Sequence, residues 1–126
     1  MEQFRLMMRG ISKSYGNAAA LQDVDFSVRP GEVHALIGEN GAGKSTLLNI
    51  LSGVRGADSG EISVNGNRVQ IRSPLSARQA GIAMIHQELQ HVPELSVAQN
   101  MFLGRPLTRA GGWWVDKKAQ LARATL

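Results

Sequence analysis

A glycine-rich segment, IGENGAGKST (residues 37–46), holds the residue types best suited to binding phosphate groups. It fits the pattern G-x-x-x-x-G-K-[ST] at every fixed position, from Gly38 to Ser45. Glycines let backbone N–H groups turn inward without a clash at Cβ, so that they form a concave shell of donors. The Lys44 ammonium can reach the β- and γ-phosphates of a nucleoside triphosphate, and the Ser45 hydroxyl can bind Mg²⁺. The pattern predicts such a site without specifying the base.

Two apolar runs flank this segment and should position it. Residues 32–38 (EVHALIG) are nearly all apolar, as expected for a strand buried on both faces. Residues 44–51 place leucines at helical spacing, and Gly53 supplies a C-terminal stop. A helix that begins next to Gly43 directs its unpaired N–H groups and the positive end of its dipole at the phosphates. The alternative, a glycine-rich turn that matches by chance, does not explain this strand–loop–helix context.

The remaining elements are predicted from alternation, turn residues and caps. We expect residues 24–28 (VDFSV) to form a half-buried strand and to pair with residues 32–38 as a hairpin across the turn at 29–31. Asn65-Gly66 is the pair favoured by a type I′ turn. The other expected elements are a strand in 4–16, a hairpin over 61–71, a strand at 82–88, a loop at 104–114, and helices at 74–80, 96–102 and 115–126.

Composition indicates a globular chain of one small domain or a piece of a larger one. The 126 residues are 43% apolar and contain no cysteine, which excludes disulfides and thiolate metal sites. No apolar run approaches the ~20 residues that span a bilayer, and we expect a cytoplasmic protein. The formal net charge of +4 suits an anionic ligand or nucleic acid. Because the basic residues are scattered, we expect no nucleic-acid partner.

The longer pattern resembles a known family. ISKSYGNAAALQDVDFSVRPGEVHALIGENGAGKSTLLNILSG (residues 11–53) resembles the start of an ABC-type ATPase domain. Within that superfamily the chain resembles the ATP-binding subunit of bacterial sugar importers of the ribose, galactose and xylose class. GADSGEISVNG, GIAMIHQELQHVPELSVAQNMFLGR and the loop leading to WW carry this narrower resemblance, which covers nearly the whole chain.

The resemblance implies roles for individual residues. Tyr15 matches the aromatic residue that stacks on adenine, although spacing alone also allows a surface tyrosine at a strand end. Gln87 matches the glutamine that meets Mg²⁺ and the attacking water. Lys44 and Gln87 would then be catalytic residues, and Ser45 and Gln87 would be metal ligands. The ATP cradle would comprise Gly38, Glu39, Asn40, Gly41, Ala42, Gly43, Lys44, Ser45 and Thr46.

We expect the histidines and tryptophans of the chain to have structural rather than catalytic or base-binding roles. His86 does not match the family's catalytic histidine, which belongs far downstream. We expect His34 to be a satisfied core residue and His91 to face solvent. Trp113 and Trp114 are expected to pack against a loop rather than to stack on bases.

Several parts of the family's machinery are absent from these 126 residues. There is no LSGGQ-type signature, no apolar strand that ends in an Asp-Glu pair, and no switch histidine. Residues 1–126 would therefore be the incomplete N-terminal part of one ABC domain, in a protein that carries two such domains. We expect Mg·ATP binding with negligible hydrolysis, because the water-positioning carboxylate is missing. The strand at 33–37 would lack parallel neighbours, which predicts marginal stability, self-association or a rearranged strand exchange.

The expected fold is α/β: a P-loop core fragment with an antiparallel β-subdomain and the start of a helical subdomain. The resemblance implies a full-length protein that couples ATP hydrolysis to sugar import at the inner face of the cell membrane. Its partners would be a membrane permease, contacted through residues 88–102 after Gln87, a second ABC domain and, indirectly, a periplasmic sugar-binding protein. A nucleotide-binding module without turnover and a soluble ABC protein acting on ribosomes or DNA remain open. A GTPase is less favoured, because the guanine-reading NKxD motif is absent.

Overall fold

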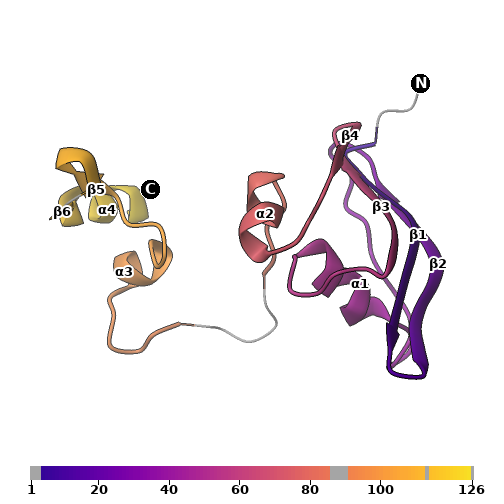
Figure 1. Cartoon of the computed structure of the whole chain (residues 1–126). Coiled ribbons are helices and arrows are strands. Elements are labelled where there is room, and N and C mark those ends of the chain that lie inside the picture. Colours follow the sequence, from indigo (N-terminus) through magenta and orange to yellow (C-terminus); the bar gives the residue numbers. More distant parts are fainter. Residues whose placement is uncertain (1–3, 86–90, 113, 126) are drawn as a thin grey trace. The chain divides into compact units, whose positions relative to one another are not determined.

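The computed structural model describes residues 4–85, 91–112 and 114–125 and divides the chain into two units, Met1–Ile85 and His86–Leu126 (Figure 1). The first unit contains β1 (Leu6–Tyr15), β2 (Ala18–Val28), α1 (Lys44–Leu51), β3 (Ser59–Val64), β4 (Asn67–Val69) and α2 (Pro74–Gln79). The second contains α3 (Val97–Met101), β5 (Thr108–Arg109), the short 3₁₀ turn η1 (Ala110–Gly112), β6 (Trp114–Val115) and α4 (Lys117–Ala124). None of the described helices is long and apolar enough to cross a membrane.

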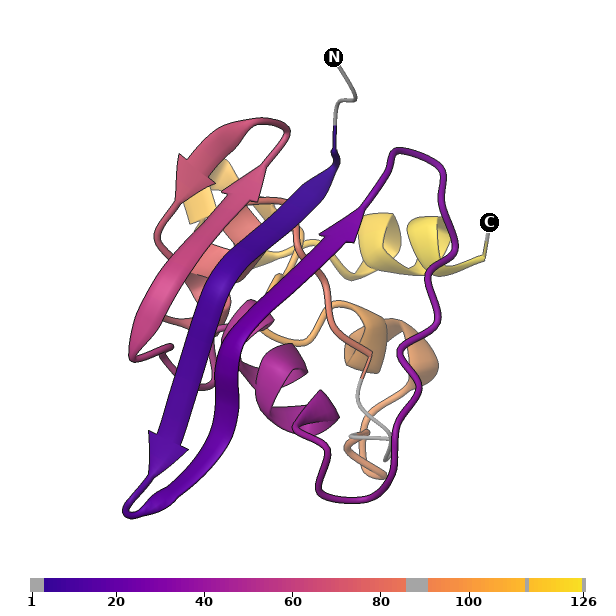
Figure 2. The same cartoon turned by 90° about the vertical axis from the view of Figure 1, so that its right-hand side faces the viewer.

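The first unit is built on a four-stranded antiparallel sheet with the order β2-β1-β3-β4. The expected hairpin around Asn65-Gly66 is confirmed as β3 and β4, and both turn residues have positive φ, at 52° and 77°. The central strand β1 pairs with β2 through the turn at residues 16–17 and with β3 on its other side (Figure 2).

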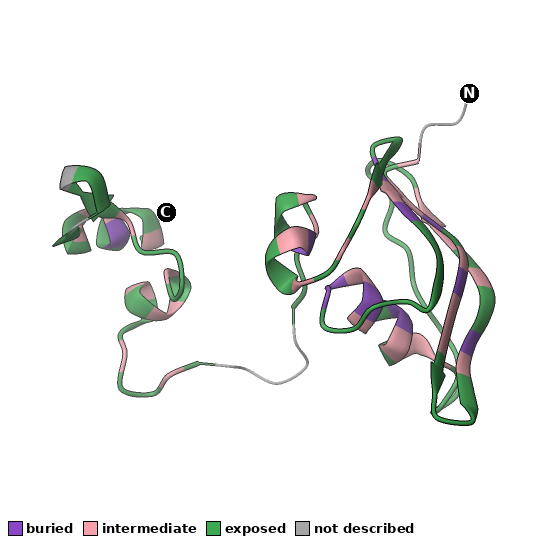
Figure 3. Cartoon of the chain, viewed as in Figure 1, coloured by how far each residue is buried: buried purple, intermediate pink, exposed green. Residues whose placement is uncertain are grey.

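The core lies between this sheet and α1. Met8 and Ile11 of β1 are fully buried, as is Ile50 of α1 at 1% exposure (Figure 3). Met8 and Ile11 are an odd number of residues apart, so in a regular strand they would point to opposite faces. The register shifts between them, and Gly10 there has a φ of 61°. This irregularity brings both side chains to the face that α1 covers. The core cluster is completed by Leu21, Leu47 and Ile62.

Two of the expected strands are wrong. Residues 32–39 run without strand pairing, and Val33 and Ile37 are 99% and 90% exposed rather than buried on both faces. The partner of β2 is β1, so the expected hairpin with residues 32–38 does not form. Residues 82–85 also lack strand pairing, and residues 86–88 of that expected strand lie outside the described part. A ladder needs a partner strand, and the described residues supply none to either segment.

The expected helices are present because their signals are local. α1 covers the predicted residues, and Gly53 follows it with a φ of 76°. α2 and α3 each begin with a capping box, at Ser73 and Ser96. Residues 104–114, expected to be a loop, instead include the small β5–β6 pair.

Candidate functional site

The glycine-rich loop turns the chain from the extended segment into α1. Gly41 and Gly43 have φ values of 90° and 86°, in the left-handed region that favours glycine. The Ala42 N–H donates to the Glu39 carbonyl oxygen at 3.1 Å, and the Leu47 N–H donates to the Gly43 carbonyl at 2.9 Å. The loop therefore closes on itself and passes directly into the first turn of the helix.

Gly43 also fixes the start of α1 against β2. A Cβ atom at this position would lie 2.7 Å from both the Ala20 carbonyl oxygen and Leu21 Cδ2, a distance that side chains do not tolerate. Only glycine fits here, for its positive φ and for this close approach. The loop is therefore held at the end of the sheet where β2 begins.

The first turn of α1 carries no side-chain cap. The other three described α-helices have caps from Ser73, Ser96 and Asp116, each of which accepts a hydrogen bond from a first-turn N–H. The N-cap of α1 is Gly43, which has no side chain to do so. The helix thus presents free N–H donors and the positive end of its dipole beside the loop, which is an arrangement suited to an anion.

Lys44 lies folded into the loop. Its Nζ donates hydrogen bonds to the carbonyl oxygens of Gly38, at 2.5 Å, and Glu39, at 2.7 Å. The next residue, Ser45, is exposed, and Thr46 is half-buried. The structure therefore brings together a cationic side chain, a hydroxyl and a set of free N–H groups within residues 38–46.

Tyr15 lies at the same end of the sheet as the loop. It is the last residue of β1, is 46% exposed, and pairs with Ala18 of β2. Two residues further along, Ala20 is the residue against which Gly43 packs. Since two residues of strand span about 7 Å, the ring of Tyr15 belongs to the neighbourhood of the loop.

A charged pair that sequence reasoning missed adjoins Tyr15. Asp58 Oδ1 accepts a hydrogen bond from Lys13 Nζ at 2.6 Å, and Asp58 Oδ2 accepts one from the Ser14 N–H at 2.8 Å. These two hydrogen bonds hold the pKa of the Asp58 carboxyl below its usual range. Lys13 Nζ also lies 5.8 Å from the centroid of the Tyr15 ring.

Residues 21–126 match the sequence model of the ABC transporter family. The chain belongs to this family. Among its ABC relatives, it is 56% identical over 107 residues to the ribose import ATP-binding protein RbsA of Chromobacterium violaceum. It is 55% identical over 123 residues to the arabinose import ATP-binding protein AraG of Rhizobium meliloti. These alignments cover 85% and 98% of the chain but only 21% and 23% of the relatives, so the chain spans about a fifth of their length.

Solved ABC structures share the fold. A nucleotide-free ATP-binding cassette from an ABC transporter matches 98% of the chain with a TM-score of 0.74 and 30% identity. Another ATP-binding cassette matches 97% of the chain with a TM-score of 0.78 and 28% identity. The aligned parts make up 46% and 51% of those two chains. The expected α/β fold of a P-loop ABC ATPase is thus confirmed, while the chain covers about half of such a cassette.

Some expected residues of this ABC chain are not placed or are placed differently. Gln87 lies outside the described residues, as do His86 and Trp113. The core role expected for His34 is wrong: its side chain is 36% exposed, with Nδ1 3.1 Å from Glu32 Oε1. The ring lies edge-on against Phe26 at the border of the core, with 5.0 Å between the ring centroids, and residues 32–39 pair with no strand that would bury it further. Trp114 is 74% exposed and does not pack as expected, while His91 faces solvent as expected.

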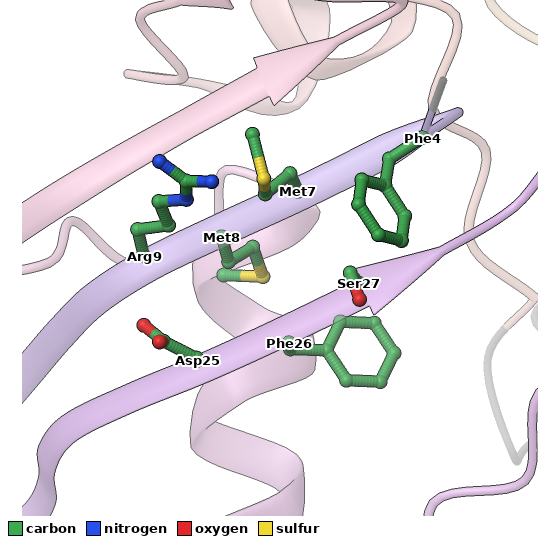
Figure 4. A pocket seen from close by; sticks show the side chains of 7 residues that line it. All are labelled: Phe4, Met7, Met8, Arg9, Asp25, Phe26 and Ser27. Atoms are coloured by element: carbon green, nitrogen blue, oxygen red, sulfur yellow. The ribbon is translucent and has the colours of Figure 1, made fainter. Parts of the chain in front are cut away.

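A pocket of about 240 Å³ opens elsewhere on the first unit, along β1 and β2 (Figure 4). Its walls include Phe4, Met8 and Phe26. Asp25, also in the wall, already accepts a hydrogen bond from the Gly10 N–H at 2.8 Å. None of the predicted site residues lines this pocket, so the glycine-rich loop remains the candidate site.

Proposed function

We propose that this chain binds Mg·ATP through residues 38–46. The observation that carries the proposal is the uncapped N-terminus of α1, preceded by a loop that closes around the Lys44 ammonium. Backbone N–H groups of the loop and the helix would surround the β- and γ-phosphates. On binding ATP, Lys44 would exchange one or both of its carbonyl partners for phosphate oxygens. A hydrogen bond from an ammonium to a charged phosphate oxygen is stronger than one to a neutral carbonyl oxygen.

Magnesium and the base would be bound by neighbouring residues. Ser45 is exposed, and its hydroxyl oxygen would bind Mg²⁺ together with phosphate oxygens of the nucleotide, because Mg²⁺ is a hard cation that prefers oxygen ligands. Tyr15 offers an exposed ring for adenine at the same end of the sheet. We assign Gln87 to the metal and the attacking water, on the resemblance to ABC ATPases alone.

The longer protein to which this chain would belong is proposed to drive sugar import. The names of the relatives, ribose and arabinose import ATP-binding proteins, support that assignment. In this proposal residues 1–126 are the N-terminal part of one ABC domain, which works with a second ABC domain at the inner face of the membrane. By itself the chain would bind ATP with negligible hydrolysis, because the signature and the water-positioning carboxylate are absent from its sequence.

Contact with a membrane permease is proposed for residues 88–102. Within the described part of this stretch, α3 exposes two apolar side chains one helical turn apart, Val97 at 75% and Met101 at 52%. Exposed apolar residues on one helix face are typical of a protein contact. A periplasmic sugar-binding protein would act through that permease and not on this chain directly.

Calorimetric titration of the purified chain with Mg·ATP tests the proposal, with phosphate release followed in parallel. We expect saturable binding in the wild type and its loss in Lys44→Ala, since removal of one such charged contact costs about 2–4 kcal/mol. Lys118→Ala, which removes an exposed lysine of α4, is the matched control and should bind as the wild type does. Equal affinity in the wild type and Lys44→Ala would overturn the proposal.

A further inference from the structure

We propose that Asp58 is a positioning residue for the adenine platform: it ties Lys13 and Ser14 to the loop before β3, and so fixes Lys13 against one face of the Tyr15 ring. The inference rests on the proposed function, because it assigns Tyr15 to the base of bound ATP. It adds a residue that neither the loop pattern nor local sequence indicates, since Asp58 lies more than 40 residues from its partners.

Three hydrogen bonds join Asp58 to consecutive residues of β1. The carboxylate accepts from Lys13 Nζ at 2.6 Å and from the Ser14 N–H at 2.8 Å, one bond to each oxygen. The Asp58 N–H donates to the Ser12 carbonyl oxygen at 2.9 Å. The two residues that precede Tyr15 are thus held by both carboxylate oxygens, which leaves the end of β1 little freedom to shift.

Lys13 transmits this constraint to the ring. Lys13 and Tyr15 are two residues apart in a strand, so their side chains lie on the same face of the sheet. Lys13 Nζ lies 5.8 Å from the ring centroid, within the range of a cation–π contact. The Lys13 side chain is only 18% exposed, whereas Tyr15 is 46% exposed. The ammonium therefore takes one side of the ring and leaves exposed area for a base to stack on.

Without the carboxylate, Lys13 loses its ion pair and its fixed rotamer. A free lysine samples many conformations, some of which cover the exposed part of the ring. Tyr15 would keep its place in the strand but would be a poorer platform. The expected defect concerns binding of the base only. Among the described residues, the hydrogen bonds, ion pair and ring contact of the Asp58 and Lys13 side chains all lie outside the loop at residues 38–46.

The test compares two ligands, Mg·ATP and magnesium tripolyphosphate, which share the phosphate chain but differ in the base. We expect Asp58→Ala and Lys13→Met to weaken binding of Mg·ATP by about threefold to tenfold. Binding of tripolyphosphate should change by less than about twofold, and Tyr15→Ala should show the same split. Asp58→Asn, which retains the size and one acceptor oxygen, should fall between Asp58→Ala and the wild type. Glu61→Ala is the matched control: this exposed carboxylate pairs with Arg68 at 3.0 Å and should leave both affinities unchanged.

The tyrosine itself provides a second measurement. Tyr15 is the only tyrosine of the sequence, so labelled tyrosine gives one set of ring signals by NMR. We expect these signals to shift in Asp58→Ala without any ligand, and to shift again in the wild type when ATP is added but not when tripolyphosphate is added.

Four outcomes would overturn the inference. Equal loss of both ligands in Asp58→Ala would indicate a general structural role, and unchanged affinities would indicate no role. Tyrosine signals that do not move in Asp58→Ala would show that the ring is not held through Asp58. If the wild type binds neither ligand, the proposed function itself is wrong and the inference fails with it. That last result is distinct from a wild type that binds both ligands without sensitivity to Asp58.

Discussion

At the residue scale, the two loop glycines with left-handed backbone differ in what surrounds them. A Cβ at Gly43 would lie 2.7 Å from Ala20 and Leu21, whereas a Cβ at Gly41 would meet nothing within 4 Å. Gly41→Ala should therefore cost only the strain of its positive φ, about 1 kcal/mol of unfolding free energy. Gly43→Ala should cost about 2–4 kcal/mol, because it adds a backbone clash. Urea denaturation followed by circular dichroism measures both losses, and equal losses would contradict the packing described here.

At the same scale, Asp58 should make the stability of the fold depend on pH in the acid range. Its hydrogen bonds lower the pKa of the folded state below the reference value of 3.8, so the carboxylate stabilises the fold at pH values above 3.8. This contribution is lost as the pH falls through the lower, folded pKa. We expect the wild type to be more stable than Asp58→Asn at neutral pH, and the difference to shrink only below pH 3.8. Urea midpoints measured across the acid range give this difference. A gap that closes well above that pH would show that Asp58 is not held as described.

The structural roles of residues at the candidate site were predictable where a local sequence pattern determines them. The loop from Gly38 to Ser45 is such a case, since its spacing alone predicts the glycine turns and the position of the lysine. The pair of Asp58 and Lys13 was not predictable, because its partners meet only when β1 and β3 lie side by side. Long-range pairing of this kind leaves no periodic signal in the sequence.

At the element scale, the same distinction separates the correct predictions from the wrong ones. α1, α2 and the hairpin at Asn65-Gly66 were predicted because caps, turn residues and spacing act within a few residues. The prediction of a strand at residues 32–38 was wrong, because apolar composition indicates only that a segment favours burial and does not identify a pairing partner. Whether it forms a strand depends on a partner, and no described strand pairs with it.

The capping box of α2 allows a prediction at this scale. Ser73 Oγ accepts a hydrogen bond from the Ser76 N–H at 3.2 Å, and Ser76 Oγ accepts one from the Ser73 N–H at 3.0 Å. Ser73→Ala removes the first bond and should lower the unfolding free energy by about 1 kcal/mol. Ser73→Asp, which restores a capping oxygen, should recover most of this loss in the same urea titration. Ser63→Ala, at a strand position paired with Arg68, serves as the control, and a loss as large there would argue against a capping effect.

At the scale of the whole molecule, the unpaired apolar segments predict that the chain associates with itself. Val33 and Ile85 are 99% and 96% exposed, and each lies in an extended segment with no strand partner among the described residues. Such segments offer both apolar side chains and free backbone groups, and a second copy can pair with them.

Sedimentation velocity tests this self-association. We expect oligomers whose share rises with protein concentration. The double variant Val33→Lys, Ile85→Lys should be more monomeric than the wild type, because the two added charges oppose burial of these segments. Leu121→Lys is the matched control: Leu121 is also exposed, at 62%, but it lies in α4, where the backbone is already hydrogen-bonded. A wild-type chain that stays monomeric at every concentration, or an equal effect of Leu121→Lys, would mean that the extended segments do not drive association.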